Sequence, residues 1–178
     1  MRADAVRNFD SVLQTGAAVL AEDPGASMAA IAERAGVDRS TVYRRFANRE
    51  ALLAAVYQAK NDAAQEAMDD ARLEQAPVAV ALHRYIENIV GVTRRWPVDT
   101  DRFMADPVAG AEAAKRLARL RAFVARATRD GLFATDEEWT LELLRALPGL
   151  VAHRTSLEPG PAADLVVQTL LDGLRTPR

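Results

Sequence analysis

Cysteine is absent from the 178-residue sequence, and histidine occurs only at His83 and His153. The absence of cysteine excludes disulfides and thiolate metal sites, and two histidines are too few for the usual zinc ligand sets. Hydrophobic residues still make up 49% of the chain, enough for a substantial core. No stretch approaches the roughly 20 apolar residues of a membrane span, and an apolar signal segment is missing. We expect a soluble cytoplasmic protein with no membrane partner, no metal and no cofactor.

Enzyme motifs are missing as well. The chain has no glycine-rich phosphate loop, no nucleophile elbow and no segment with a β-strand pattern. His83 and His153 are isolated in helical patterns, where a histidine more often packs or lies at the surface than acts as a base. We therefore expect no enzymatic activity.

The formal net charge is only −2, but the arginines are unevenly distributed. Between residues 34 and 49 they surround the single acid Asp38, at Arg34, Arg39, Arg44, Arg45 and Arg49. Acids follow downstream at Asp62, Glu66, Asp69, Asp70 and Glu74. A small basic segment in an otherwise acidic chain favours a localised contact with nucleic acid, with an ordinary solvated surface as the alternative.

The segment from Ser27 to Phe46 has the pattern of two short helices around a tight turn. Ser27 can cap the first helix, and Gly36 can adopt the left-handed conformation that ends it. Asp38 can cap the second helix, in which Val42 and Phe46 repeat at helical spacing. This order is the helix-turn-helix plan, whose second helix enters the major groove of DNA.

The run from Ile31 to Leu52 resembles the DNA-binding domain of TetR (tetracycline-repressor) family regulators. In that family a Tyr-x-x-Phe is followed by a short turn and Lys-Glu-x-Leu, and the matching positions are Tyr43, Phe46, Arg49, Glu50 and Leu52. Ser40 stands where the family most often has glycine, and Arg49 where it most often has lysine. The resemblance covers the first third of the chain.

Helical periodicity continues along the rest of the chain. A first helix is predicted over 4–22 and a long one from 48 to about 72, followed by helices over 77–96, 111–128, 136–151 and 161–174. Residues 100–104 are predicted as another helix or an irregular stretch. No Gly/Ser-rich linker is present. We expect an all-α fold: an N-terminal three-helix helix-turn-helix DNA-binding domain, residues 1–50, joined by the long helix to a C-terminal helical ligand-binding and dimerisation domain, residues 51–178.

The expected DNA contacts divide by role. Arg39, Ser40 and Thr41 open the second short helix, and we expect them to reach base edges. Phosphate contacts, which fix register without reading sequence, are expected at Ser27, Tyr43, Arg44 and Arg49.

The resemblance implies two further surfaces, because family members usually bind a small-molecule effector in the C-terminal domain and pair through their last two helices. The pocket candidates are bulky side chains: Tyr85, Trp96, Phe103, Met104, Phe123 and Trp139. The interface candidates are leucines: Leu143, Leu147, Leu150, Leu165 and Leu170. Ordinary core packing is the alternative for both sets.

The function expected is that of a homodimeric repressor released from a palindromic double-stranded DNA operator by a small-molecule effector. One alternative is a DNA-binding protein that acts without an effector, as an activator or a structural protein. A C-terminal domain without a cavity would favour it. The other is a DNA-targeted enzyme, which would need catalytic residues outside the helix-turn-helix domain, called the head below.

Overall fold

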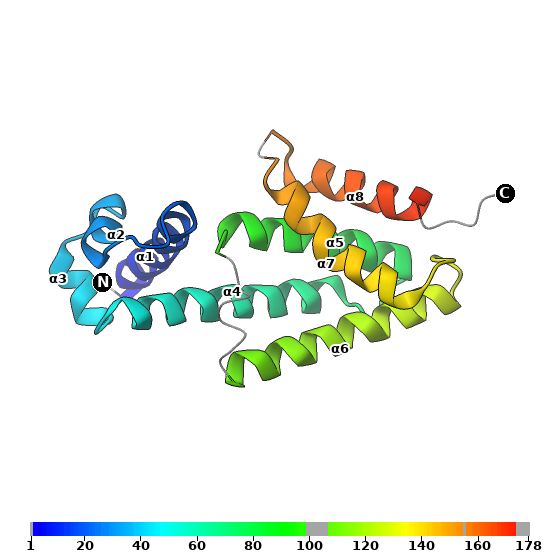
Figure 1. The fold of residues 1–178 in the computed structure, drawn as a ribbon, viewed down its shortest axis with the longest axis horizontal. Coiled ribbons are helices and arrows are strands. Elements are labelled where there is room, and N and C mark those ends of the chain that lie inside the picture. The colour runs from blue at the N-terminus through cyan, green and yellow to red at the C-terminus, as the bar shows by residue number, and fades with distance from the viewer. Residues whose placement is uncertain (1, 99–106, 155, 174–178) are drawn as a thin grey trace. The chain divides into compact units, whose positions relative to one another are not determined.

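The computed structural model describes residues 2–98, 107–154 and 156–173, without the side chains of 2–9 and 107–109. Every regular element in these segments is an α-helix (Figure 1). The helices are α1 (Arg2–Glu22), α2 (Met28–Arg34), α3 (Arg39–Arg45), α4 (Arg49–Ala71), α5 (Val78–Arg95), α6 (Pro107–Arg129), α7 (Glu137–Ala152) and α8 (Pro159–Gly173). The all-α prediction is confirmed, with helix ends shifted by a few residues. The predicted stretch 100–104 lies outside the described residues.

The chain divides into two compact units, each described here by itself. The first runs to Asp62 and includes the segment that begins at Arg95. The second comprises Ala63–Arg94 and the chain from Pro107 onward. The sequence placed the domain boundary at residue 50, at the start of the long helix, whereas the division falls further along within α4. Side-chain packing sets this division, because the backbone hydrogen bonds of a helix continue past it. None of the described helices is long and apolar enough to cross a membrane.

Three helices of the first unit meet at Gly16 of α1. A β-carbon added to Gly16 would lie 3.6 Å from the Ile31 side chain, 3.7 Å from Val56 and 3.9 Å from Leu52. These three side chains, from α2 and α4, are fully buried. α2 also packs against α3, so the small core ties the two helices of the helix-turn-helix together.

The turn between α2 and α3 depends on Gly36, whose φ is +65°. Its N–H donates to the Glu33 carbonyl, and the Val37 N–H donates to the Ala32 carbonyl, both at 3.1 Å. This pair of bonds is a Schellman motif, which satisfies the last carbonyls of a helix and needs a left-handed residue at this position. The predicted role of Gly36 is confirmed.

The second unit is held together by one larger core. In this core α7 packs against both α6 and α8. The buried residues of the core include Phe123 of α6, Leu144 of α7 and Leu170 of α8. Asp136 caps α7 by accepting from the Trp139 N–H at 2.9 Å, as predicted.

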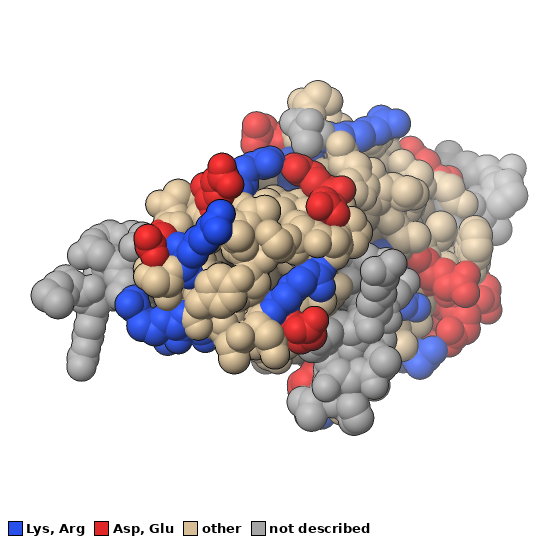
Figure 2. All heavy atoms as spheres, turned by 60° about the vertical axis from the view of Figure 1, so that its left-hand side comes forward, with Lys and Arg blue, Asp and Glu red and all other residues tan. Residues whose placement is uncertain are grey.

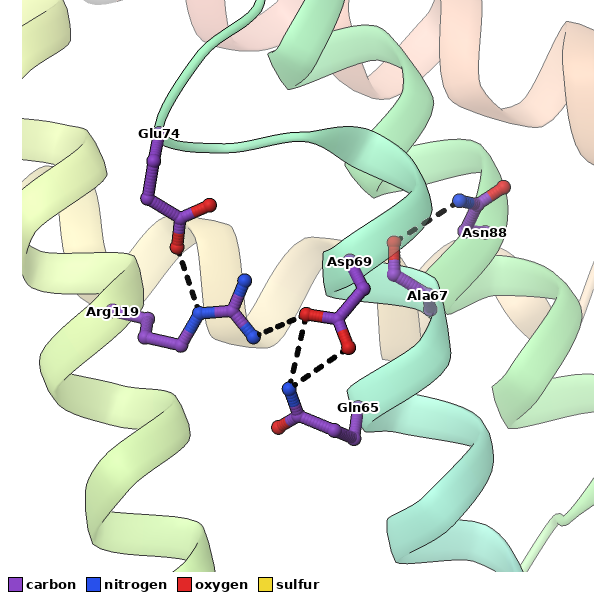
Figure 3. Close-up of polar contacts among 6 residues, drawn as sticks. All are labelled: Gln65, Ala67, Asp69, Glu74, Asn88 and Arg119. Atoms are coloured by element: carbon purple, nitrogen blue, oxygen red, sulfur yellow. Dashed lines mark hydrogen bonds and ion pairs between the residues drawn. The ribbon is translucent and has the colours of Figure 1, made fainter.

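Side chains from α5 and α6 hold the C-terminal end of α4 (Figure 3). Arg119 of α6 donates through Nε to Glu74 at 2.8 Å and through Nη1 to Asp69 at 2.7 Å. The pKa values of both carboxyls are lowered, chiefly because each accepts a hydrogen bond from Arg119. Asn88 of α5 donates to the Ala67 carbonyl at 3.1 Å. The end of α4 is therefore fixed within the second unit by polar contacts as well as by the core.

Candidate DNA-binding site

Asp38 caps the N-terminus of α3: its carboxylate accepts a hydrogen bond from the Ser40 N–H at 2.7 Å. Hydrogen bonds from the Ser40 side chain and backbone lower the pKa of Asp38. The carboxylate therefore stays ionised at neutral pH, beside the positive end of the α3 dipole. The cap predicted from the sequence is present, and it fixes where α3 starts.

The outer surface of α3 presents four of the predicted DNA contacts. Arg39, Ser40, Tyr43 and Arg44 are exposed, and Tyr43 keeps 52% of its surface accessible. Val42 on the inner side of the same helix is 1% exposed. Helical geometry places Ser40 and Arg44 opposite Val42, with Arg39 and Tyr43 at the flanks of the helix. α3 itself contains no acidic residue. The helix thus offers two cations, a hydroxyl and a phenol to a partner.

The inner surface of α3 determines how this helix is aimed. Val42 and Phe46 are buried in the small core of the first unit, while Thr41 at the side of the helix is half-buried. The Thr41 hydroxyl is therefore less accessible than the other predicted base-reading groups. Its contact with a base edge stays a prediction.

An ion pair reduces the basic character expected between residues 34 and 49. Arg34 Nη2 lies 3.2 Å from a carboxylate oxygen of Glu22, which ends α1, and both side chains are largely exposed. Figure 2 shows Lys and Arg interspersed with Asp and Glu over this face, without one continuous basic surface. Sequence reasoning missed the pair, because its partners belong to different helices and no local spacing joins them.

The other two predicted phosphate contacts have roles within the protein. The Ser27 hydroxyl accepts from the Ala30 N–H at 3.2 Å and caps α2, as predicted. Arg49 donates through Nε to the Ala26 carbonyl at 3.1 Å, and its Nη2 donates to the Pro24 carbonyl. Both carbonyls belong to the turn between α1 and α2. The sequence did not indicate this use of Arg49, and phosphate contacts at Ser27 and Arg49 stay predictions.

The pocket candidates do not share one environment. Tyr85 and Phe123 are buried in the core of the second unit, and burial raises the pKa of Tyr85 to about 12. Trp96 is buried in the first unit, and Trp139 on α7 is 52% exposed. The remaining two candidates lie outside the described residues: Phe103 and Met104. A shared effector site stays a prediction.

The interface candidates fall into two groups. Leu150 is 67% exposed and Leu165 is 42% exposed, while Leu143 and Leu147 are half-buried. Leu170 is 1% exposed and packs in the core of its own unit, so its side chain is far less accessible than those of Leu150 and Leu165. Its place in an interface stays a prediction. Helical periodicity alone could not show which apolar side of α8 faces inward.

The outward surfaces of the last two helices differ in polarity. On α7, Trp139, Leu143 and Leu150 fall on one helical stripe. On α8, the exposed residues near Leu165 include polar ones: Gln168, Thr169 and Asp172. The wider exposed apolar stripe therefore belongs to α7.

Comparison with known proteins identifies the head. Residues 13–56 match the family model described as bacterial regulatory proteins, tetR family. Over these residues the chain matches the TetR family. The match spans α1 from residue 13, both helices of the helix-turn-helix and the start of α4. It confirms the resemblance that Tyr43, Phe46 and Leu52 indicated.

Relatives and solved structures extend the comparison. The chain is 37% identical over 82 residues to the HTH-type transcriptional repressor LfrR of Mycolicibacterium smegmatis, covering 46% of this chain and 43% of that protein. The solved structure of LfrR in complex with proflavine is similar in fold, with a TM-score of 0.73 and 24% identity over 96% of this chain and 98% of that chain. KstR2 of Mycobacterium tuberculosis, a ketosteroid transcriptional regulator, has a TM-score of 0.75 and 16% identity, covering 96% of each chain. These structures show that the TetR-like fold extends over nearly the whole chain.

Proposed function

We propose that this TetR-family protein is a cytoplasmic transcriptional repressor that binds a palindromic operator as a homodimer and is released by a small-molecule effector. The observation that carries the proposal is the outer surface of α3. Arg39, Ser40, Tyr43 and Arg44 are exposed on a helix whose opposite side is locked in the core. An acid-free helix that exposes Arg39 and Arg44 suits the major groove of DNA.

Roles on DNA follow from position in α3. Arg39 and Ser40 open the helix, and the N-terminal residues of a recognition helix contact base edges. Tyr43 and Arg44 lie one turn further on and suit phosphates, which set the register of the helix in the groove. Two such heads in a homodimer would require half-sites related by two-fold symmetry.

Dimerisation is proposed through the outward side of α7 and through Leu165 of α8. Trp139 and Leu150 are exposed at 52% and 67% on one helical stripe, and a contiguous exposed apolar patch is typical of an interaction surface. Aromatic residues are enriched at the centres of interfaces. Substituting glutamate for Leu150 should shift the dimer toward monomer without unfolding it, as measured by light scattering and circular dichroism.

Effector control is proposed through the second unit. α4 begins in the head and ends among the contacts of Arg119 and Asn88, so a ligand that alters those contacts acts on the helix that carries the head. A ligand shifts this equilibrium only by its differential affinity for the two states. Proflavine, which LfrR binds in its solved structure, is the first compound to test.

Selection of bound fragments from random DNA at two salt concentrations tests the proposal. If a dimer neutralises roughly six to eight phosphates, log affinity should fall against log salt with a slope of about −5 to −7. The selected sequences should contain an inverted repeat. A slope near zero, or no enriched sequence, would contradict the proposed function. Proflavine that lowers affinity for the selected duplex would support effector release, and a second unit that binds no small molecule would favour the effector-free alternative.

A further inference from the structure

Arg49 occupies a position where its charge alone is unfavourable. It lies in the first turn of α4, and a cation near the N-terminus of a helix opposes the helix dipole. The same turn is already capped by Asn48, whose side chain accepts from the Ala51 N–H at 2.8 Å. The helix start therefore does not need Arg49, and its role must come from what its guanidinium contacts.

The guanidinium of Arg49 joins two carbonyls of one short turn. Nε donates to the Ala26 carbonyl at 3.1 Å, and Nη2 donates to the Pro24 carbonyl. The planar guanidinium presents both donors along one edge, so a single side chain can hold two neighbouring acceptors in a fixed geometry. Lysine has a compact ammonium on a flexible stem and cannot reproduce this paired contact.

This turn, Asp23–Ala26, connects α1 to α2 and has internal bonds of its own. Asp23 accepts from the Gly25 N–H through its carboxylate at 2.8 Å and from the Ala26 N–H through its carbonyl at 3.0 Å. Ser27 follows directly and caps α2. Arg49 and Asp23 thus act on the same turn, one from α4 and one from within the turn.

The turn determines where α2 starts, and α2 packs against α3. A shift of the turn therefore moves α2, and with it α3, whose exposed surface carries Arg39 and Arg44. Recognition is sensitive to such shifts, because hydrogen bonds to bases and phosphates need distances near 3 Å and good alignment.

We propose that Arg49 is a positioning residue for DNA binding: by clamping the turn Asp23–Ala26 it holds α2, and α3 packed on it, in the arrangement that fits the groove. This inference rests on the proposed DNA-binding function. In this proposal Arg49 acts through geometry, and the phosphate contact predicted from the sequence is the alternative that the test below separates from it. Arg44, exposed on α3, is the contrasting case in which the charge itself contacts DNA.

The first test compares Arg49→Gln, Arg49→Lys and Arg44→Gln in the full-length chain, with the duplex that the wild type selects from random DNA. Arg44→Gln should reduce the salt slope by about 2 per dimer, at roughly 0.9 per phosphate. Both Arg49 variants should keep the wild-type slope and bind about five- to thirtyfold more weakly at every salt concentration. Lysine keeps the charge, so its failure to restore affinity would identify the paired carbonyl contact as the cause.

The second test approaches the turn from Asp23, with a matched control. Asp23→Ala and Asp23→Asn remove the same negative charge, but only asparagine keeps an oxygen that can accept from the Gly25 N–H. Simple electrostatics predicts that both variants bind DNA more tightly. The positioning role predicts that Asp23→Ala binds more weakly than Asp23→Asn, and that amide hydrogen exchange in α2 is faster in Asp23→Ala.

The outcomes separate the two proposals. The positioning role is overturned if Arg49→Lys binds like the wild type, or if Arg49→Gln loses as much salt slope as Arg44→Gln. It is also overturned if Asp23→Ala and Asp23→Asn bind equally well. In each of these cases DNA binding itself stands. A wild-type chain that selects no duplex would instead remove the proposed function.

Discussion

Two arginines of α3 and three of α6 have opposite surroundings. On α3, Arg39 and Arg44 are exposed, and within the described residues the structure records no ion pair for either. On α6, Arg121 makes two hydrogen bonds to Glu138 at 3.0 and 3.1 Å, and Arg119 bridges two carboxylates. Arg126 donates to the carbonyls of the segment after α4, at 3.2 and 2.9 Å.

The difference follows from what the chain places nearby. Arg119, Arg121 and Arg126 lie next to acids or to carbonyls near the end of α4, so they donate hydrogen bonds inside the protein. The outer surface of α3 contains no acid, so Arg39 and Arg44 keep their donors for another molecule. Arg49 belongs with α6 in this respect, although it lies in the head. Arginine content alone therefore does not locate a nucleic-acid surface, and the partners of each arginine must be known.

Leucines of the last two helices also divide into buried and exposed side chains, and substituting a buried one should have the largest effect on the free energy of unfolding. Leu170→Ala should lower the free energy of unfolding by about 2–5 kcal/mol, because it empties a site within the core. Leu150→Ala is the matched control, and its effect on subunit folding should stay within about 0.5 kcal/mol. Urea unfolding over a range of protein concentrations separates folding from association. Equal losses in the free energy of unfolding for the two variants would contradict the assignment of Leu170 as buried and Leu150 as exposed.

Removing an exposed arginine of α3 should affect DNA binding and leave stability nearly unchanged. Arg39→Ala should lose about 1–3 kcal/mol of binding free energy per half-site and change the preferred bases. Its thermal unfolding should match the wild type, because Arg39 is exposed. Binding titrations against the selected duplex and its single-base variants measure both effects. An unchanged base preference would assign Arg39 to phosphate contacts.

Removing an arginine that is hydrogen-bonded within the protein should lower stability and leave DNA binding nearly unchanged. Arg119→Ala should lower the free energy of unfolding by about 0.5–1 kcal/mol and leave the salt slope of DNA binding unchanged. The pKa values of Asp69 and Glu74 are lowered in the folded state, so their ionised forms stabilise the fold at neutral pH. That contribution is lost as pH falls through the lowered values. The stability difference between wild type and variant should therefore be full at pH 7 and shrink below about pH 4, as followed by unfolding in a pH series.

The smallest expected effect is a gain in stability within the head. Gly16→Ala adds a β-carbon that would lie at ordinary contact distances of 3.6–3.9 Å from Ile31, Val56 and Leu52. Alanine in a helix interior is favoured over glycine by about 0.5–1 kcal/mol, so the melting temperature should rise. Because Gly16 is remote in sequence from α3 and buried, DNA affinity should not change. Altered affinity would show that packing of the head and its binding surface are not separable.

Much of the head could be predicted from sequence because its signals are local. The caps at Ser27, Asp38 and Asn48 and the turn at Gly36 each depend on hydrogen bonds within a few residues. The spacing of Val42 and Phe46 likewise predicted which side of α3 is buried. These features determined the helix-turn-helix, which lies in the part of the chain that matches the TetR family.

Contacts between distant segments could not be predicted in this way. The pairing of Arg34 with Glu22, the clamp of Arg49 on its turn, and the burial of Leu170 all depend on how helices pack. Periodicity shows that a helix has an apolar side, but only packing against the neighbouring helices determines which of its apolar side chains are buried. The sequence by itself therefore determined the helices, their ends and the kind of surface on α3. The tertiary structure decided which arginines are bound within the protein and which leucines remain open, because both outcomes depend on atoms brought together from far along the chain.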